Sequence, residues 1–190
     1  MVRAILTVIG CALLAGCWVS EQRLFQDGDW ARLDLASKYT SEDANGSDQA
    51  HVVLQARPNG LIESTSVGVE NGETEHSVLG FVGIEGGSGR YFLLVDRSDP
   101  SGDGDFYLIA HLTDEGAIEL YWPDCNGTPP IDGVTVERDD FLDEAVCAFS
   151  TKAALMRAGL GAERFLSAKH IVAVQAMGKR VPDDDSAEAE

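Results

Sequence analysis

Hydrophobic residues recur in short alternating runs through the middle of the chain, and glycine, asparagine or aspartate separates one run from the next. A strand with one buried face shows this two-residue period, whereas a surface helix shows a period of about 3.6 residues. The turn sequences Pro58-Asn59-Gly60 and Asn71-Gly72 supply the positive φ angles that tight hairpins need. The pattern predicts strands at residues 51–56, 62–70, 75–84, 91–96, 106–112, 117–122 and 135–137.

One convincing helix is predicted after these strands. Ser150 is placed to cap a run over 151–158 that carries Ala154 and Leu155 on one face, and Gly159 offers a stop. A short helical turn at 162–166 and a last strand at 170–176 follow. We therefore expect a mainly β fold of the β-rich α+β class, an antiparallel sheet or partly closed barrel with one C-terminal helix.

The first residues have the pattern of an export signal. Arg3 is their only charge, an apolar run follows it, and small residues precede Cys17. The run over 4–16 is shorter than the roughly 20 apolar residues that a membrane-spanning helix needs. Residues 1–16 are therefore expected to be a cleaved signal peptide.

The residues at the cleavage point refine this expectation. Leu14-Ala15-Gly16-Cys17 resembles the lipobox of bacterial lipoproteins. The resemblance implies cleavage before Cys17 and acyl chains, palmitate among them, on this residue, which would make the lipid bilayer its partner. Val8-Ile9-Gly10-Cys11 fits a looser version of the motif, but the apolar run before it is too short. In enterobacterial lipoproteins, an aspartate directly after the lipidated cysteine favours retention in the inner membrane. Trp18 occupies that position here, so the resemblance implies an outer-membrane lipoprotein facing the periplasm.

Cys125 and Cys147 are the other cysteines of the expected mature chain. An even pair in an exported protein predicts a disulfide, and the spacing matches neither a redox C-x-x-C motif nor a zinc motif. Tyr121-Trp122-Pro123-Asp124-Cys125 and the later Cys147-Ala148-Phe149 are loosely similar to small uncharacterised bacterial lipoproteins. That similarity supports the disulfide and transfers no activity.

Four segments are expected along the chain. After the signal peptide, residues 17–28 read as a lipidated tether and residues 29–180 as a single β-rich globular domain. Residues 181–190 are expected to be a disordered tail, because residues 182–190 carry five acidic side chains and no core-forming residue larger than alanine. The formal net charge of −18 argues against nucleic acid as a partner.

The best candidate for chemistry is an aspartate-rich loop. Measured from Asp99, the residues Ser101, Asp103 and Gly104 fit positions of a calcium-binding loop, but the bidentate glutamate is replaced by Ala110. Asp99, Ser101, Asp103 and Asp105 are therefore weak candidates, and no metal and no cofactor are expected. A polar hairpin loop explains the same residues.

Histidines give no close ligand or catalytic spacing. His111 with Asp114, or His76 with Glu75 and Glu85, are pairs that only the fold can bring together. No catalytic residue is assigned, and we expect no enzyme. An aromatic group on neighbouring strands is interpreted as core, with an apolar cleft as the alternative; it comprises Tyr91, Phe92, Phe106, Tyr107, Tyr121 and Trp122.

Three classes of function remain. The leading interpretation is a membrane-anchored envelope lipoprotein whose periplasmic domain is a non-catalytic module that contacts an envelope protein. The alternative is a small-molecule or lipid-binding module that uses the sheet or barrel interior, which requires an open cavity. A hydrolase comes third.

Overall fold

The computed structural model describes residues 17–43, 49–70, 72–97, 104–123, 125, 131–139, 144–168 and 175–179. Its elements in chain order are β1 (Cys17–Ser20), β2 (Lys38–Asp43), β3 (Gln49–Ala56), β4 (Ile62–Gly68), β5 (Thr74–Gly83), β6 (Tyr91–Asp96), β7 (Asp105–Leu112), β8 (Ile118–Tyr121), β9 (Val134–Asp139), β10 (Glu144–Phe149), α2 (Lys152–Ala168) and β11 (Gln175–Lys179). The expected signal peptide and acidic tail lie outside the described residues.

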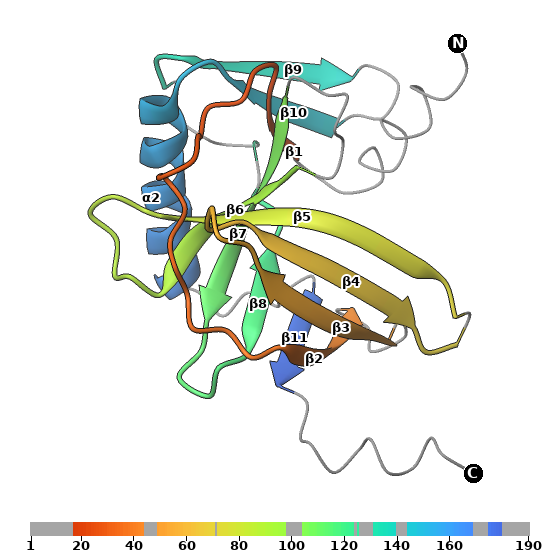
Figure 1. Ribbon diagram of the computed structural model, residues 1–190. Helices are drawn as coiled ribbons and strands as arrows, with labels where there is room; N and C mark the ends of the chain where they lie inside the picture. Colours follow the sequence, from red (N-terminus) through yellow and green to blue (C-terminus); the bar gives the residue numbers. More distant parts are fainter. Residues whose placement is uncertain are drawn as a thin grey trace, which may run out of the picture.

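Eight strands form an antiparallel barrel in the order β6–β5–β4–β3–β2–β11–β8–β7, and pairing of β6 with β7 closes it. Outside the barrel, β1, β10 and β9 continue from β7 as a small sheet, in which β1 and β10 run parallel (Figure 1). One edge of β7 serves both parts, because its first residues pair with β1 and its last residues pair with β8. The predicted β-rich fold with one C-terminal helix is confirmed, and the barrel is fully closed.

Strand alternation divides the hydrophobic residues into two cores. On β6, Phe92 and Leu94 point into the barrel, whereas Leu93 and Val95 point outward toward α2. The core outside the barrel lies between the sheet and α2, and Phe25 and Trp30 also contribute to it. The aromatic group predicted as one cluster is therefore divided among both cores and the surface.

The barrel interior is filled by side chains in the part of the chain that the structure describes. Its inward residues are each less than one-tenth exposed and pack as one cluster: Tyr39, Val52, Leu54, Ile62, Phe81, Phe92, Leu94, Ala110, Ile118, Leu120 and Met177. Close packing of this kind is typical of a small barrel core. A binding module that uses the barrel interior would need an opening among these residues.

Helix α2 differs from its predicted form at both ends. Thr151 caps it, since its Oγ1 accepts a hydrogen bond from the Ala154 N–H at 3.2 Å, while Ser150 donates to the Gly133 carbonyl. The helix continues through Gly159, which lacks a side chain where α2 approaches β6: a Cβ there would lie 3.3 Å from Leu93. Packing against the sheet thus outweighs the helix-breaking tendency of glycine, which is about 1 kcal/mol.

The sequence patterns missed three strands, β1, β2 and β10. Of the predicted strand at 170–176, the described part lies in β11, which runs from Gln175 to Lys179 and so continues past the predicted end through Gly178. Residues 170–174 lie outside the described part of the chain. β2 and β11 pair with each other and complete the barrel between β3 and β8.

The segment between β1 and β2 crosses the outside of β5, where Trp30 packs directly on Gly80. A Cβ on Gly80 would lie 2.4 Å from two carbon atoms of the Trp30 indole, and Trp30 is only 6% exposed. The guanidinium of Arg97 lies 4.6 Å from the centre of that ring. Trp30 is therefore held between the sheet and Arg97.

Gly80→Ala is expected to lower the free energy of unfolding by about 1–3 kcal/mol, because the added methyl group must displace Trp30. Gly83→Ala in the same strand is the matched control, since a Cβ there meets no atom within 4 Å. The control should change stability by less than about 1 kcal/mol. Urea denaturation followed by tryptophan fluorescence measures both, and equal effects of the two substitutions would contradict the close contact.

Candidate functional site

Cys17, the residue expected to carry lipid, is the first residue of β1. This strand lies between β7 and β10, with Cys17 paired to Val146 and Trp18 paired to both Tyr107 and Cys147. The expectation of a tether over 17–28 is therefore wrong. Trp18 and Phe25 are 3% and 1% exposed, and burying such large aromatic side chains holds this segment in the domain.

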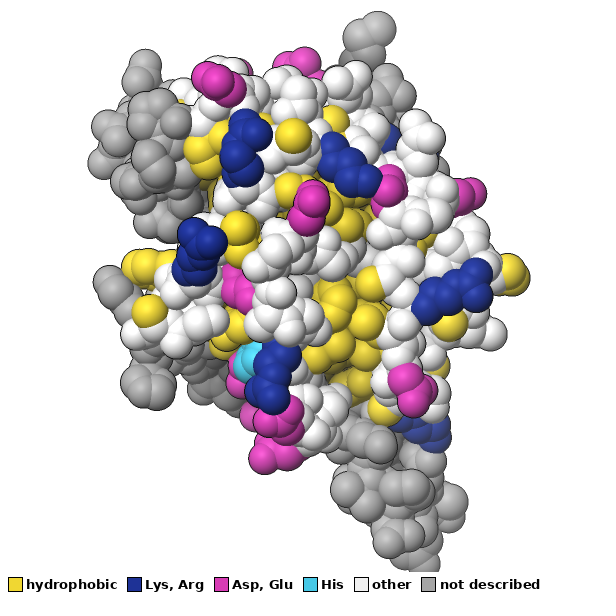
Figure 2. All heavy atoms as spheres, turned by 90° about the vertical axis from the view of Figure 1, so that its left-hand side faces the viewer, with side chains coloured by type: hydrophobic (Ala, Val, Ile, Leu, Met, Phe, Trp, Pro, Cys, Tyr) yellow, Lys and Arg dark blue, Asp and Glu magenta, His cyan; other side chains and the backbone are white. Residues whose placement is uncertain are grey.

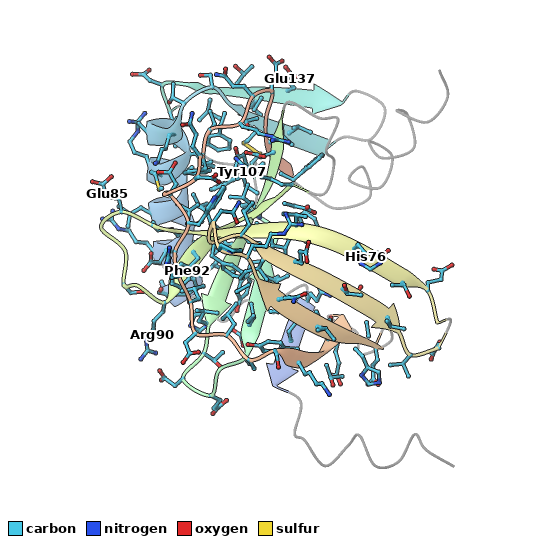
Figure 3. All side chains as sticks on the ribbon, viewed as in Figure 1. His76, Glu85, Arg90, Phe92, Tyr107 and Glu137 are labelled. Atoms are coloured by element: carbon cyan, nitrogen blue, oxygen red, sulfur yellow. A yellow bond between two sulfur atoms is a disulfide. The ribbon has the colours of Figure 1, made fainter. Side chains whose placement is uncertain are left out.

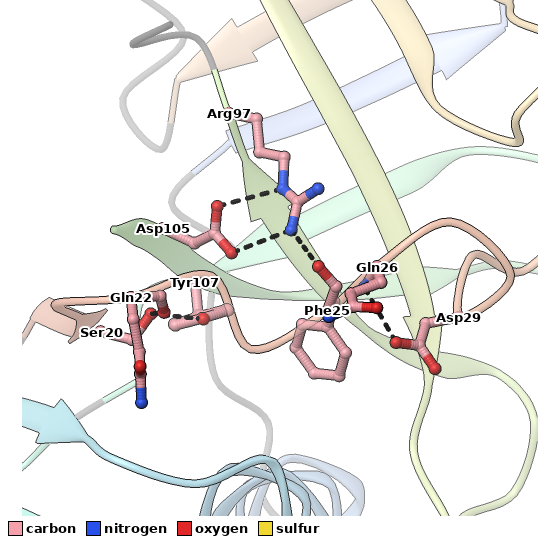
Figure 4. A network of polar contacts seen from close by, with 8 residues as sticks. All are labelled: Ser20, Gln22, Phe25, Gln26, Asp29, Arg97, Asp105 and Tyr107. Atoms are coloured by element: carbon pink, nitrogen blue, oxygen red, sulfur yellow. Dashed lines mark hydrogen bonds and ion pairs between the residues drawn. The ribbon is translucent and has the colours of Figure 1, made fainter. Parts of the chain in front are cut away.

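Hydrogen bonds fix the end of β1 to β7 (Figure 4). The Ser20 hydroxyl donates to the Gln22 carbonyl at 2.7 Å and lies 2.7 Å from the Tyr107 hydroxyl, which accordingly donates to Ser20. Burial raises the pKa of Tyr107 far above its usual value, so this phenol stays protonated. The bond between Ser20 and Tyr107 thus persists at any physiological pH.

A buried ion pair lies beside this bond. Arg97 donates from Nε to one oxygen of Asp105 at 3.1 Å and from Nη2 to the other at 3.2 Å, and their side chains are 10% and 0% exposed. Burial raises the pKa of Asp105, and the hydrogen bonds from Arg97 oppose that shift. Arg97 also donates to the Phe25 carbonyl (Figure 4), so one guanidinium joins β6, β7 and the segment after β1.

A second ion pair attaches the same segment to the helix. Lys152, the first residue of α2, bonds to the Asp29 carboxylate, and its ammonium group lies 5.3 Å from the Phe25 ring centre. The hydrogen bond from Lys152 lowers the pKa of Asp29, with a further contribution from the Gln26 N–H. Residues 17–30 are thus secured to both the sheet and the helix.

The opposite face of the small sheet carries apolar side chains that belong to neither core. Trp18, Tyr107 and Cys147 point toward α2, so the alternating residues of the same strands point away from it. We call this surface the β1 face; its residues are Val19, Phe106, Val146 and Ala148. Phe106 is 38% exposed and pairs with Val19, while the other three are partly exposed.

The β1 face begins where the barrel ends. Phe106 occupies the same side of β7 as Leu108 and Ala110, which contact the barrel core. The inward row of β7 therefore leaves the barrel and becomes the exposed side of the small sheet. Cys17 stands at this junction, one residue before Trp18 and opposite Val146.

Cys125 and Cys147 form the disulfide that the sequence predicts. Their Cα atoms are 5.8 Å apart, and both residues are almost fully buried in the core under α2. Cys147 pairs with Trp18 across β1 and β10. The bond therefore connects the segment after β8 to the strand beside β1.

The aspartate-rich loop is only partly described. Asp99, Ser101 and Asp103 lie outside the described residues, and the carboxylate of Asp105 is bonded to Arg97. Among the residues that the structure describes, no group of three His, Cys, Asp or Glu side chains is arranged to hold a metal ion.

His111 forms a pair with a different carboxylate from the one suggested by the sequence. Its Nδ1 lies 2.8 Å from Glu119, and the Tyr121 hydroxyl donates to the same carboxylate oxygen at 2.9 Å. Asp114 instead pairs with Arg90. Strand pairing explains why His111 contacts Glu119, because the two residues are register partners on β7 and β8.

The second histidine pair predicted as an alternative does not form. Figure 3 shows His76 and Glu85 near opposite ends of β5, and His76 Nδ1 lies 3.1 Å from the Thr65 hydroxyl. The His111 ring stacks on Tyr91 with 4.4 Å between ring centres. Within the described residues, no serine or cysteine is hydrogen-bonded to the His111 ring.

A shallow groove on α2 is a further concave surface; it is lined by Glu85, Lys152, Ala153, Met156, Arg157 and Leu160. Figure 2 shows the side of the molecule that α2 covers, where basic, acidic and hydrophobic groups are interspersed. Lys152 is engaged with Asp29, and Arg157 donates to the Asp132 carbonyl at 3.0 Å. Both cations therefore make contacts that stabilise the fold.

Comparison of the sequence and structure with family models, curated proteins and solved structures finds no match. In the described part of the chain, no helix has the length and apolar character needed to cross a membrane. The β1 face with Cys17 is thus assigned as the candidate site on its own geometry. Sequence reasoning singled out Cys17, placed Phe106 in an aromatic group interpreted as core, and missed Val19, Val146 and Ala148. Val19 and Phe106 come together only through the pairing of β1 with β7.

Proposed function

We propose that this chain is an envelope lipoprotein anchored through Cys17 to the outer membrane. Its barrel domain then acts as a non-catalytic interaction module on the periplasmic side. The observation that carries the proposal is the lipobox Leu14-Ala15-Gly16-Cys17, and the pairing of Cys17 with Val146 supports it because the expected first residue of the mature chain lies in a strand of the domain. Cleavage before Cys17 would keep every described pair that β1 makes with β7 and β10.

Two further features support export and an interaction role. The buried Cys125–Cys147 bond suits an oxidising compartment. His111, the histidine best placed for acid–base chemistry, is stacked on Tyr91 and shares its carboxylate with Tyr121, which is how a structural histidine is held. These contacts favour an interaction module over a hydrolase.

Cys17→Ala is expected to abolish acylation and cleavage and to leave the precursor without its diacylglycerol mass. Cys11→Ala is the matched control, because it removes the other cysteine that fits a lipobox while Cys17 remains. Intact-mass analysis and density separation of inner and outer membranes, in a bacterial host, measure the result. A Cys17→Ala protein that still gains diacylglycerol would overturn the proposal, and the loss of lipid in Cys11→Ala alone would move the anchor to Cys11.

A further inference from the structure

The β1 face is an exposed apolar surface that lies beside the proposed anchor in the described part of the chain. We infer that this face rests on the lipid bilayer itself and that its partner is zwitterionic phospholipid. The inference depends on the proposed anchoring at Cys17. It adds an orientation: the small sheet lies against the membrane, and α2 lies on the side away from it.

Cys17 is joined to the sheet without a spacer. Cys17 is itself a paired strand residue, and Val19 follows two positions later, about 7 Å along β1 at 3.3 Å per residue. Phe106 is on the neighbouring strand, about 5 Å further away. Acyl chains at Cys17 would therefore hold these side chains at the level of the lipid headgroups.

The side chains of the β1 face suit the surface of a bilayer. Valine, alanine and phenylalanine carry no charge and gain free energy when they leave water, so a headgroup and acyl-chain boundary suits them. Carboxylates stand at the rim, since Glu137 is the register partner of Val146 and Asp96 is the register partner of Phe106. These acids would be repelled by anionic lipid, which is why the partner is zwitterionic.

A second exposed phenylalanine provides a matched control. Phe165 is 50% exposed and lies on α2, which packs against the other face of the small sheet, whereas Phe106 is 38% exposed on the β1 face. The two positions share residue type and similar exposure. Only Phe106 should meet lipid if the β1 face rests on the bilayer.

The experiment replaces Phe106 or Phe165, one at a time, with the photo-reactive residue p-benzoylphenylalanine in the full chain. Each lipidated protein is purified, inserted into phosphatidylcholine vesicles and irradiated, and intact mass is measured. We expect a phospholipid adduct for the probe at 106, at least five times more abundant than for the probe at 165. Phosphatidylglycerol added to the vesicles should reduce the adduct at 106.

The outcomes separate the two proposals. A protein that lacks diacylglycerol and does not float with vesicles contradicts the anchoring at Cys17. A protein that carries diacylglycerol and floats, but yields equal or no adduct at the two positions, overturns the orientation alone. Irradiation in living cells adds a further outcome: a protein adduct at 106, without a lipid adduct, would overturn the bilayer as the partner of this face.

Discussion

Asp105→Ala is expected to lower the free energy of unfolding by about 3–5 kcal/mol, because it leaves the charge of Arg97 buried without a counterion. Among the described residues, the Arg97 guanidinium would retain the Phe25 carbonyl and the Trp30 ring, and neither carries a compensating charge. Removal of this ion pair should also loosen β1, since Asp105 pairs with Ser20. Urea denaturation measures the change in stability.

Asp114→Ala is the matched control for this prediction. Arg90 and Asp114 form the same type of ion pair, but their side chains are 57% and 79% exposed. Solvent screens such a pair, so its loss should cost at most about 1 kcal/mol. Equal destabilisation by the two substitutions would show that burial does not set the strength of the Arg97–Asp105 pair.

Replacement of both charged residues tests whether the unpaired charge of Arg97 causes the loss of stability. In Arg97→Met with Asp105→Leu no charge is left buried, and a buried ion pair replaced by apolar groups often retains or gains stability. The double variant should therefore be more stable than Asp105→Ala. A double variant as unstable as the single one would point to the hydrogen bond with Phe25, and not to the unpaired charge, as the main loss.

Local signals predicted the hairpins from β3 to β8 well. In a hairpin, the strand, its glycine or asparagine turn and the returning strand are neighbours in sequence. A local sequence pattern therefore covers both strands that pair. β1 and β10 had no such signal: they pair in parallel although Trp18 and Cys147 are far apart along the chain. Only the assembled sheet shows that Cys17 belongs to a strand and not to a tether.

Some residues of the candidate site follow from local sequence motifs, whereas the contacts of others depend on strand pairing. Cys17 and the two disulfide cysteines were found from motifs, which are local or need only a count. The sequence makes Asp105 a weak candidate for a loop of oxygen ligands, because spacing along the chain gives no weight to Arg97, the cation that directly follows the adjacent strand β6. His111 was paired with Asp114, its nearest acid in sequence, whereas strand register places Glu119 opposite it.

Loss of the Cys125–Cys147 bond is expected to lower the free energy of unfolding by about 3 kcal/mol. The bond closes a loop with a sequence separation of 22, and the chain-entropy model gives roughly this value for such a loop. Cys147 is also fully buried beside Trp18, so the sulfur atoms contribute packing as well as a link. The double variant Cys125→Ala with Cys147→Ala, compared with the unreduced protein in urea, measures the loss.

Reduction of the native protein provides the control for that substitution. Because both cysteines are almost fully buried, dithiothreitol should reach the bond slowly in the folded state and quickly in urea. The reduced protein should then unfold at a lower urea concentration, whereas dithiothreitol should leave the double alanine variant unchanged. Two free thiols in the exported protein before any reduction would contradict the bond, and with it one support for a periplasmic location.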